Sequence, residues 1–124
     1  MPPVALPVNE AILFNQKKWT STNEKTSMSC LFRGTLGQVF YLYSDTEGNY
    51  ALDIKIADTL WKQVAEGTVG TDELEIIDVK YFAKEMRVRF TPTSVPAVFT
   101  AEVFGYPSVF IRDTSGWING IIDP

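Results

Sequence analysis

The feature that most constrains the fold of this chain is an alternation of apolar and polar residues in short stretches. Within residues 86–90 every second residue is apolar and the two between them are arginines, and residues 50–56 and 97–106 alternate in a similar way. Successive side chains of a β-strand point to opposite faces of a sheet, so a period of two indicates strands with one buried face.

Turn-forming residues separate these stretches along the whole chain. We count about seven or eight short strands at a spacing of roughly 8–12 residues, which is typical of a sandwich or barrel. No long segment has the apolar spacing of an amphipathic helix. The sequence therefore predicts an all-β fold, a single-domain antiparallel β-sandwich of jelly-roll type with extended terminal arms.

Two strands are predicted to form a hairpin in the first half of the chain. Residues 38–44 are β-branched and aromatic, and residues 50–56 alternate, with a polar, glycine-containing loop over 45–49 between them. Before them, we expect a strand over 26–33, with Met28, Cys30 and Phe32 on one face, and a turn over 34–37 because it contains two glycines.

Residues 59–66 leave two structures open. Asp58 could cap a short helix that ends at Gly67. Alternatively, residues 60–64 form another strand, which we favour because tertiary context decides such short segments and the neighbouring segments are all strands.

The alternation also predicts which side chains are buried. Tyr41 and Tyr43 share one strand face, opposite Phe40 and Leu42. Arg87 and Arg89 are expected to face outward and to contribute little to stability. Truncation of a predicted core residue to alanine should lower the free energy of unfolding by about 2–5 kcal/mol. These core residues are Phe40, Leu42, Ile54, Val88, Phe90 and Val103.

The two ends of the chain differ from the central residues 11–108, which we assign to the sandwich. Residues 1–10 carry three prolines, which fix the backbone and lack an N–H, so we expect an extended arm. Residues 109–124 form an unusually apolar tail, which should be buried on its own domain or on a partner. The predicted partner-binding residues are Pro2, Pro3, Val4, Leu6, Pro7, Trp117, Ile118, Ile121 and Ile122.

The chain lacks histidine and has a single cysteine, which limits the chemistry that it can carry out. It has no histidine, which excludes Ser-His-Asp and Cys-His catalysis and removes the commonest transition-metal ligand. Its single cysteine, Cys30, excludes an intramolecular disulfide and reads as a small buried hydrophobe. We therefore expect no enzyme, cofactor or metal site. A pair of carboxylates facing each other in a cleft is the remaining catalytic alternative.

Charge and hydropathy narrow the range of partners. The formal net charge is −4, whereas a nucleic-acid binder needs a basic surface. The N-terminus lacks the features of a signal peptide, and no apolar run approaches the roughly 18 residues of a membrane span. We expect a protein made in a cytoplasm that binds neither nucleic acid nor a membrane.

Three segments resemble parts of small jelly-roll domains in bacteriophage virions. Residues 38–50 are similar to their strand, Ser-Asp turn and Gly-Asn-aromatic hairpin, and residues 86–92 with 101–107 are similar to their closing strand pair. The likeness spans residues 26–107. This family includes capsid decoration (cement) proteins, head fibres and tail-associated modules. The resemblance implies a non-enzymatic virion protein that binds the major capsid protein or another virion protein, often as a trimer.

A carbohydrate-binding module is the alternative that the same strand pattern allows. Such a module stacks sugars on an exposed row of aromatic side chains. The candidate aromatics are Trp19, Trp61, Trp117, Tyr41, Tyr43, Tyr50 and Tyr106.

Overall fold

A computed structural model describes residues 10–32, 35–82 and 84–107 of the chain. In these residues the chain forms nine β-strands and no helix, which confirms the predicted all-β class. The strands are β1 (Glu10–Trp19), β2 (Lys25–Thr26), β3 (Cys30–Leu31), β4 (Thr35–Ser44), β5 (Gly48–Ile56), β6 (Leu60–Val69), β7 (Glu73–Val79), β8 (Glu85–Pro92) and β9 (Ala97–Pro107).

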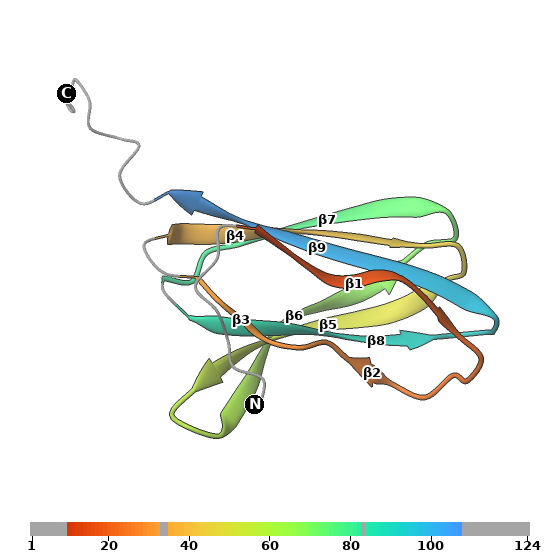
Figure 1. Cartoon of the computed structure of the whole chain (residues 1–124), viewed down its shortest axis with the longest axis horizontal. Coiled ribbons are helices and arrows are strands. Elements are labelled where there is room, and N and C mark those ends of the chain that lie inside the picture. Colours follow the sequence, from red (N-terminus) through yellow and green to blue (C-terminus); the bar gives the residue numbers. More distant parts are fainter. Residues whose placement is uncertain (1–9, 33–34, 83, 108–124) are drawn as a thin grey trace.

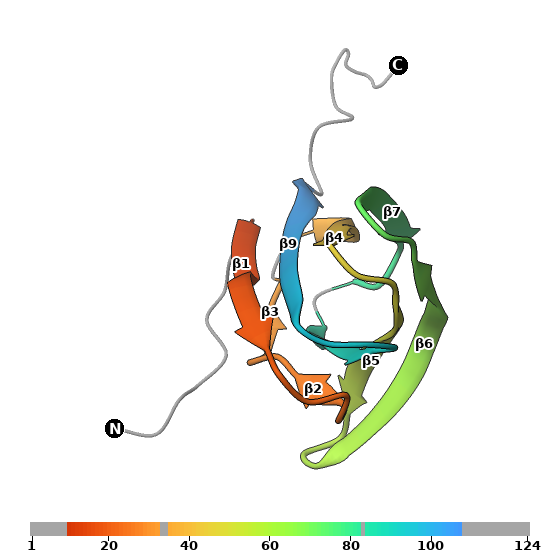
Figure 2. The ribbon, with the colours of Figure 1, turned by 90° about the vertical axis from the view of Figure 1, so that its right-hand side faces the viewer.

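Two antiparallel sheets pack against each other (Figures 1 and 2). One has the order β1-β9-β4-β7, and the other has the order β2-β8-β5-β6 with β3 also on β8. The strand pairs are nested: β1 with β9, β2 and β3 with β8, β4 with β7, and β5 with β6. A long hairpin whose two arms wrap together in this way is a jelly roll. The predicted sandwich of jelly-roll type is confirmed.

The core lies between the sheets and contains all six residues that the alternation predicted to be buried. At its centre the ring of Phe90 from β8 stacks on Phe99 from β9, with 3.9 Å between the ring centroids and 10° between the planes. Trp19 from β1 lies beside both rings, with its centroid 5.8 Å from that of Phe99 and 6.1 Å from that of Phe90. Aromatic contacts therefore connect the two sheets.

The predicted hairpin of residues 38–44 and 50–56 is wrong, because β4 and β5 lie in different sheets. Asp45 still pairs with Val98 of β9, through N–H to O at 3.2 Å and through Val98 N–H to Oδ1 at 2.8 Å. The chain crosses to the other sheet after that contact, so that both strands bury an apolar row in the same core. The two segments that the resemblance compared with closing strands belong to β8 and β9, the last two strands, which lie in opposite sheets.

The predicted strand over 26–33 is interrupted and its faces are reversed at its start. Ser27 is buried and Met28 is exposed. The Ser27 hydroxyl accepts a hydrogen bond from Val88 N–H at 3.0 Å and donates one to Met28 O at 2.7 Å. The hydroxyl thus takes the place of one backbone acceptor, while Ser27 N–H still donates to Val88 O at 2.8 Å. The alternation resumes at Cys30 and Phe32, which are buried as expected.

Glycines 37 and 67 serve close packing instead of turns. Residues 35–37 belong to β4, and a Cβ on Gly37 would lie 2.7 Å from Val79 O. Residues 60–66 belong to β6, so the favoured strand is confirmed and the helix is excluded. Gly67 lies within β6 and does not terminate a helix. A Cβ at this position would lie 2.8 Å from the Tyr50 ring, so the absence of a side chain makes room for that ring.

Candidate interaction surfaces

The partner-binding residues predicted from sequence all lie outside the described residues. Residues 1–9 and 108–124 hold every one of them, so these assignments remain predictions. The described chain begins in β1 at Glu10, which moves one residue from the predicted arm into the sandwich. Among the described residues, the candidate interaction surfaces are the outer faces of the two sheets.

The outer face of the four-stranded sheet carries a group of apolar side chains, which we call the aromatic face. Tyr41 pairs with Ile76 and Tyr43 with Leu74 across β4 and β7, so these four side chains share one face. Val39 pairs with Phe104 on β9, and the Tyr41 ring meets the Phe104 ring edge-on at 5.3 Å between centroids. The aromatic face comprises Ile12, Val39, Tyr41, Tyr43, Leu74, Ile76 and Phe104.

Several members of the aromatic face are strongly exposed. Ile12, Leu74 and Ile76 expose 53%, 53% and 56% of their surface. Single exposed apolar residues are normal, but a contiguous group on one sheet face usually marks an interaction site. The aromatic face is therefore a candidate docking surface.

Acidic groups lie both within the aromatic face and on its outer strands. Glu102 of β9 pairs with both Ile12 and Tyr41 and so lies between them, whereas Glu10 on β1 pairs with Phe104 and Asp78 on β7 pairs with Val39. A partner of this face should be largely apolar and should not be acidic.

A further acidic contact fixes one tyrosine at the margin of the aromatic face. The Tyr43 hydroxyl donates a hydrogen bond to Asp72 Oδ1 at 2.9 Å. This bond, with smaller contributions from burial and from the charges of Asp72 and Asp45, raises the pKa of Tyr43. The hydrogen bond to Asp72 fixes the Tyr43 ring, and the side chain remains exposed.

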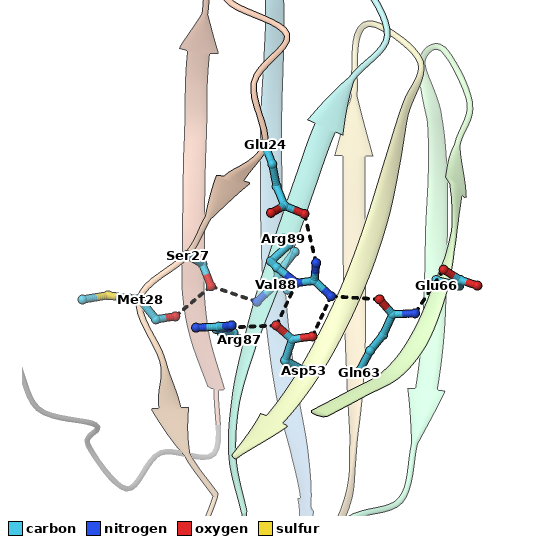
Figure 3. Close-up of polar contacts among 9 residues, drawn as sticks. All are labelled: Glu24, Ser27, Met28, Asp53, Gln63, Glu66, Arg87, Val88 and Arg89. Atoms are coloured by element: carbon cyan, nitrogen blue, oxygen red, sulfur yellow. Dashed lines mark hydrogen bonds and ion pairs between the residues drawn. The ribbon is translucent and has the colours of Figure 1, made fainter. Parts of the chain in front are cut away.

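The outer face of the five-stranded sheet is polar and centres on a buried carboxylate (Figure 3). Asp53 of β5 exposes only 2% of its surface. Its Oδ2 accepts hydrogen bonds from Arg87 Nε and Arg89 Nε, both at 2.8 Å, and its Oδ1 accepts one from Arg89 Nη2 at 2.9 Å. The two arginines lie on β8 and cover the carboxylate from the solvent side.

Arg89 extends this arrangement across neighbouring segments. It donates to Glu24 Oε2 at 3.0 Å, ahead of β2, and to Gln63 Oε1 at 2.8 Å on β6. Arg87 lies over the Trp61 ring at 4.2 Å, a cation–π contact that holds its guanidinium on the sheet. We call Glu24, Asp53, Trp61, Gln63, Arg87 and Arg89 the arginine network.

The contacts within the arginine network favour the ionised forms of Asp53 and Arg89. Burial alone would raise the pKa of Asp53, but hydrogen bonds and charges from Arg89 and Arg87 outweigh it and lower the pKa. The hydrogen bond to Asp53 is the main reason why the pKa of Arg89 is raised. Arg87 and Arg89 do face outward as predicted, yet they bind a buried charge, so the expectation that they contribute little is not supported by their contacts.

Cys30 is placed as an inert core residue. Burial, with a smaller effect from the Glu85 charge, raises the pKa of its thiol to about 12. A thiol with so high a pKa is almost fully protonated near neutral pH and is a poor nucleophile or ligand. Within residues 10–32, 35–82 and 84–107, no three Cys, Asp or Glu side chains gather as a metal site would require.

The aromatic residues proposed as a sugar platform do not form one group. Trp19 packs against the core, Trp61 lies under Arg87, and Trp117 is outside the described residues. Tyr41 and Tyr43 share one face, as the alternation predicted, and the structure shows that this face is exposed. Sequence reasoning missed Leu74 and Ile76, because it assigned no face to the strand that carries them.

The aromatic face cannot be assigned through known relatives. Comparisons with protein-family models, curated protein sequences and solved structures found no match to this chain. The described part of the chain has no helix with the length and hydropathy of a membrane span.

Proposed function

We propose that this chain is a structural protein of a virus particle, a capsid decoration (cement) protein or a related accessory protein, that binds neighbouring protein subunits. The observation that carries the proposal is the aromatic face on one side of a jelly roll. Jelly rolls are the architecture of many viral capsid proteins, and also of lectins and cupins. The chemistry of the surface favours the first of these uses.

The aromatic face suits a protein partner because aliphatic side chains form much of it. Leu74 and Ile76 flank the two tyrosines, and a surface of this kind gains free energy when it is covered by other apolar side chains. Sugar sites need several polar donors and acceptors between their aromatic rings. The acidic groups at the edge would then select the orientation of the partner.

The arginine network supports the same role from the opposite sheet. It connects segments before β2 with β5, β6 and β8 through charged hydrogen bonds, which stiffens that sheet. A rigid block loses little entropy when it docks, so more of its contact free energy remains as affinity. The proline-rich arm over residues 1–10 would add contacts to the particle.

The proposal is tested on purified particles of the virus that encodes the chain. Mass spectrometry and immunogold labelling should find the protein in a regular array on the particle. Recombinant protein added to particles that lack it should bind, and deletion of residues 1–10 should weaken binding while the circular dichroism stays that of a folded sheet. Absence of the protein from particles would overturn the proposal.

A matched pair of variants tests the aromatic face itself. Ile76→Glu places a charge in the aromatic face. Lys62→Glu introduces the same side chain at an exposed position of β6, in the other sheet. We expect Ile76→Glu to reduce particle binding at least tenfold and Lys62→Glu to leave it within twofold. Equal binding by both variants would remove the aromatic face from the attachment site.

A carbohydrate-binding module is the second candidate, supported by one observation. Tyr41 and Tyr43 present their rings on the same strand, beside Glu102, Thr100 and Asp72, which could hydrogen-bond sugar hydroxyls. Binding to a glycan array, lost in Tyr41→Ala, would favour this function. An array without binding would dismiss it.

A further inference from the structure

The apolar tail follows β9, the strand that contributes Phe104 to the aromatic face. β9 lies between β1 and β4 in the four-stranded sheet and ends at Pro107, opposite Thr35 at the start of β4 (Figure 1). Residues 108–124 follow in the sequence. A long apolar segment and an exposed apolar surface are therefore joined in one molecule.

We propose that residues 109–122 of one copy of this chain bind the aromatic face of a second copy. This inference deepens the proposed function and rests on its premise that the aromatic face is an interface. The segment that covers the aromatic face is the tail of another copy, and charge, chain direction and length support this choice.

Charge favours the tail over an acidic partner surface. Residues 109–122 contain Arg112 and Asp113 as their ionisable side chains, so this segment is neutral overall, and Asp123 follows it near the end of the tail. The same segment carries seven large apolar residues. They are Val109, Phe110, Ile111, Trp117, Ile118, Ile121 and Ile122. A neutral apolar segment can cover the aromatic face without bringing net negative charge to its carboxylates.

The same carboxylates argue against a symmetric dimer in which two aromatic faces meet. Glu10, Asp78 and Glu102 stand beside the apolar rows of each copy. A two-fold contact uses the same patch on both partners, so it would bring acidic groups of one copy near those of the other. Like charges in a desolvated interface are unfavourable.

Chain direction favours a second copy over the same copy. β9 runs from Ala97 to Pro107, and the chain therefore leaves the sheet beyond the row of Val39 and Phe104. To cover its own aromatic face the tail would have to reverse direction immediately. To reach a neighbour it needs only to continue.

Length allows the tail to cross a neighbouring face. Fourteen extended residues, the number from 109 to 122, span about 45 Å at roughly 3.3 Å per residue. Four strands at a separation of about 4.8 Å occupy only about 15 Å between the outer two. A contact from tail to face is heterologous, and repetition around a closed ring would give an oligomer such as the expected trimer.

The first test compares the oligomeric state of the full chain with that of a chain truncated after Ser108. Light scattering after size exclusion should give an oligomer for the full chain and a monomer for the truncated chain. Full-length Ile76→Glu should also be a monomer, and Lys62→Glu should remain an oligomer. A full chain that is monomeric at all concentrations, or a truncated chain that still assembles, would overturn the inference.

A complementation experiment identifies which parts meet. Full-length Ile76→Glu keeps the tail and loses the face, whereas the truncated chain keeps the face and loses the tail. Mixing the two monomers should give a one-to-one complex, and a labelled peptide of residues 108–124 should bind the truncated chain at least tenfold more tightly than truncated Ile76→Glu. If neither complex forms, the tail does not bind the face of a second copy.

The results of these oligomerisation tests can be distinguished from the results that test the proposed function. Oligomers that persist without the tail would overturn this inference while leaving a virion role intact. Tail-dependent oligomers of a protein absent from particles would do the reverse.

Discussion

Asp53→Ala probes the buried carboxylate that the alternation placed on the solvent side of β5. The substitution removes three hydrogen bonds from Arg87 and Arg89, at 2.8, 2.8 and 2.9 Å. Each hydrogen bond to a charged group contributes about 1.5–3 kcal/mol when both partners are desolvated. The carboxylate is desolvated here, with a side-chain exposure of 3%.

The arginines reduce that figure because they keep access to water. Their side chains expose 26% and 23% of their surface, so both guanidinium groups can be rehydrated once Asp53 is gone. The loss should therefore fall below the sum of three bonds and near the lower end of values for broken buried pairs. We expect Asp53→Ala to lower the free energy of unfolding by about 2–4 kcal/mol.

Urea unfolding followed by tryptophan fluorescence measures this change, with the m-value unchanged if the transition stays two-state. Lys55→Ala is the matched control in the same sheet. It removes a 3.6 Å pair with Glu85 between partly exposed side chains, which should contribute less than about 1 kcal/mol. A loss for Asp53→Ala no larger than that of the control would refute the view that the arginine network stabilises the sheet.

Three further measurements test other parts of the structure. The pKa of Asp53 is lowered in the folded chain, so its contribution to stability is complete above about pH 4 and disappears as pH falls through the folded value. The difference in unfolding free energy between wild type and Asp53→Asn should therefore shrink below pH ~4, and a constant difference in acid titrations would contradict this. Phe99→Ala removes the ring stacked on Phe90 and should cost about 3–5 kcal/mol in urea unfolding, whereas a cost below 1 kcal/mol would mean that the core does not depend on it. Cys30, with its thiol pKa of about 12, should resist a thiol reagent in the native chain and react at once after unfolding; fast native labelling would show that it is not buried.

Much of the fold was predictable because burial follows locally from alternation. Met86, Val88 and Phe90 face the core and Arg87 and Arg89 face outward, as their period of two required. The same rule placed Tyr41 and Tyr43 together on the face opposite Phe40 and Leu42, and the structure shows that face to be exposed. Two of the seven members of the aromatic face were thus visible in the sequence, whereas the contribution of Leu74 and Ile76 needed the pairing of β4 with β7.

The predicted hairpin and the predicted exposure of Ser27 were wrong for the same reason, because the local sequence fits more than one structure. The loop after Ser44 is polar and contains a glycine, which suits a hairpin and a crossing between sheets equally well. Ser27 looked like an exposed residue of a regular strand, but its hydroxyl bonds to Val88, which is 61 residues away. Neither choice can be made without the partner strand.

The residues alone were enough to predict that this chain builds strands and which apolar side chains most of those strands bury, and they include no histidine. Side-chain alternation and residue type suffice for this because they are properties of neighbouring positions. The nesting of the strands as a jelly roll, the burial of Asp53 beneath two arginines and the contact of β4 tyrosines with aliphatic residues of β7 became known from the folded structure. Those outcomes depend on contacts between residues distant in sequence, whose free energy no short segment contains.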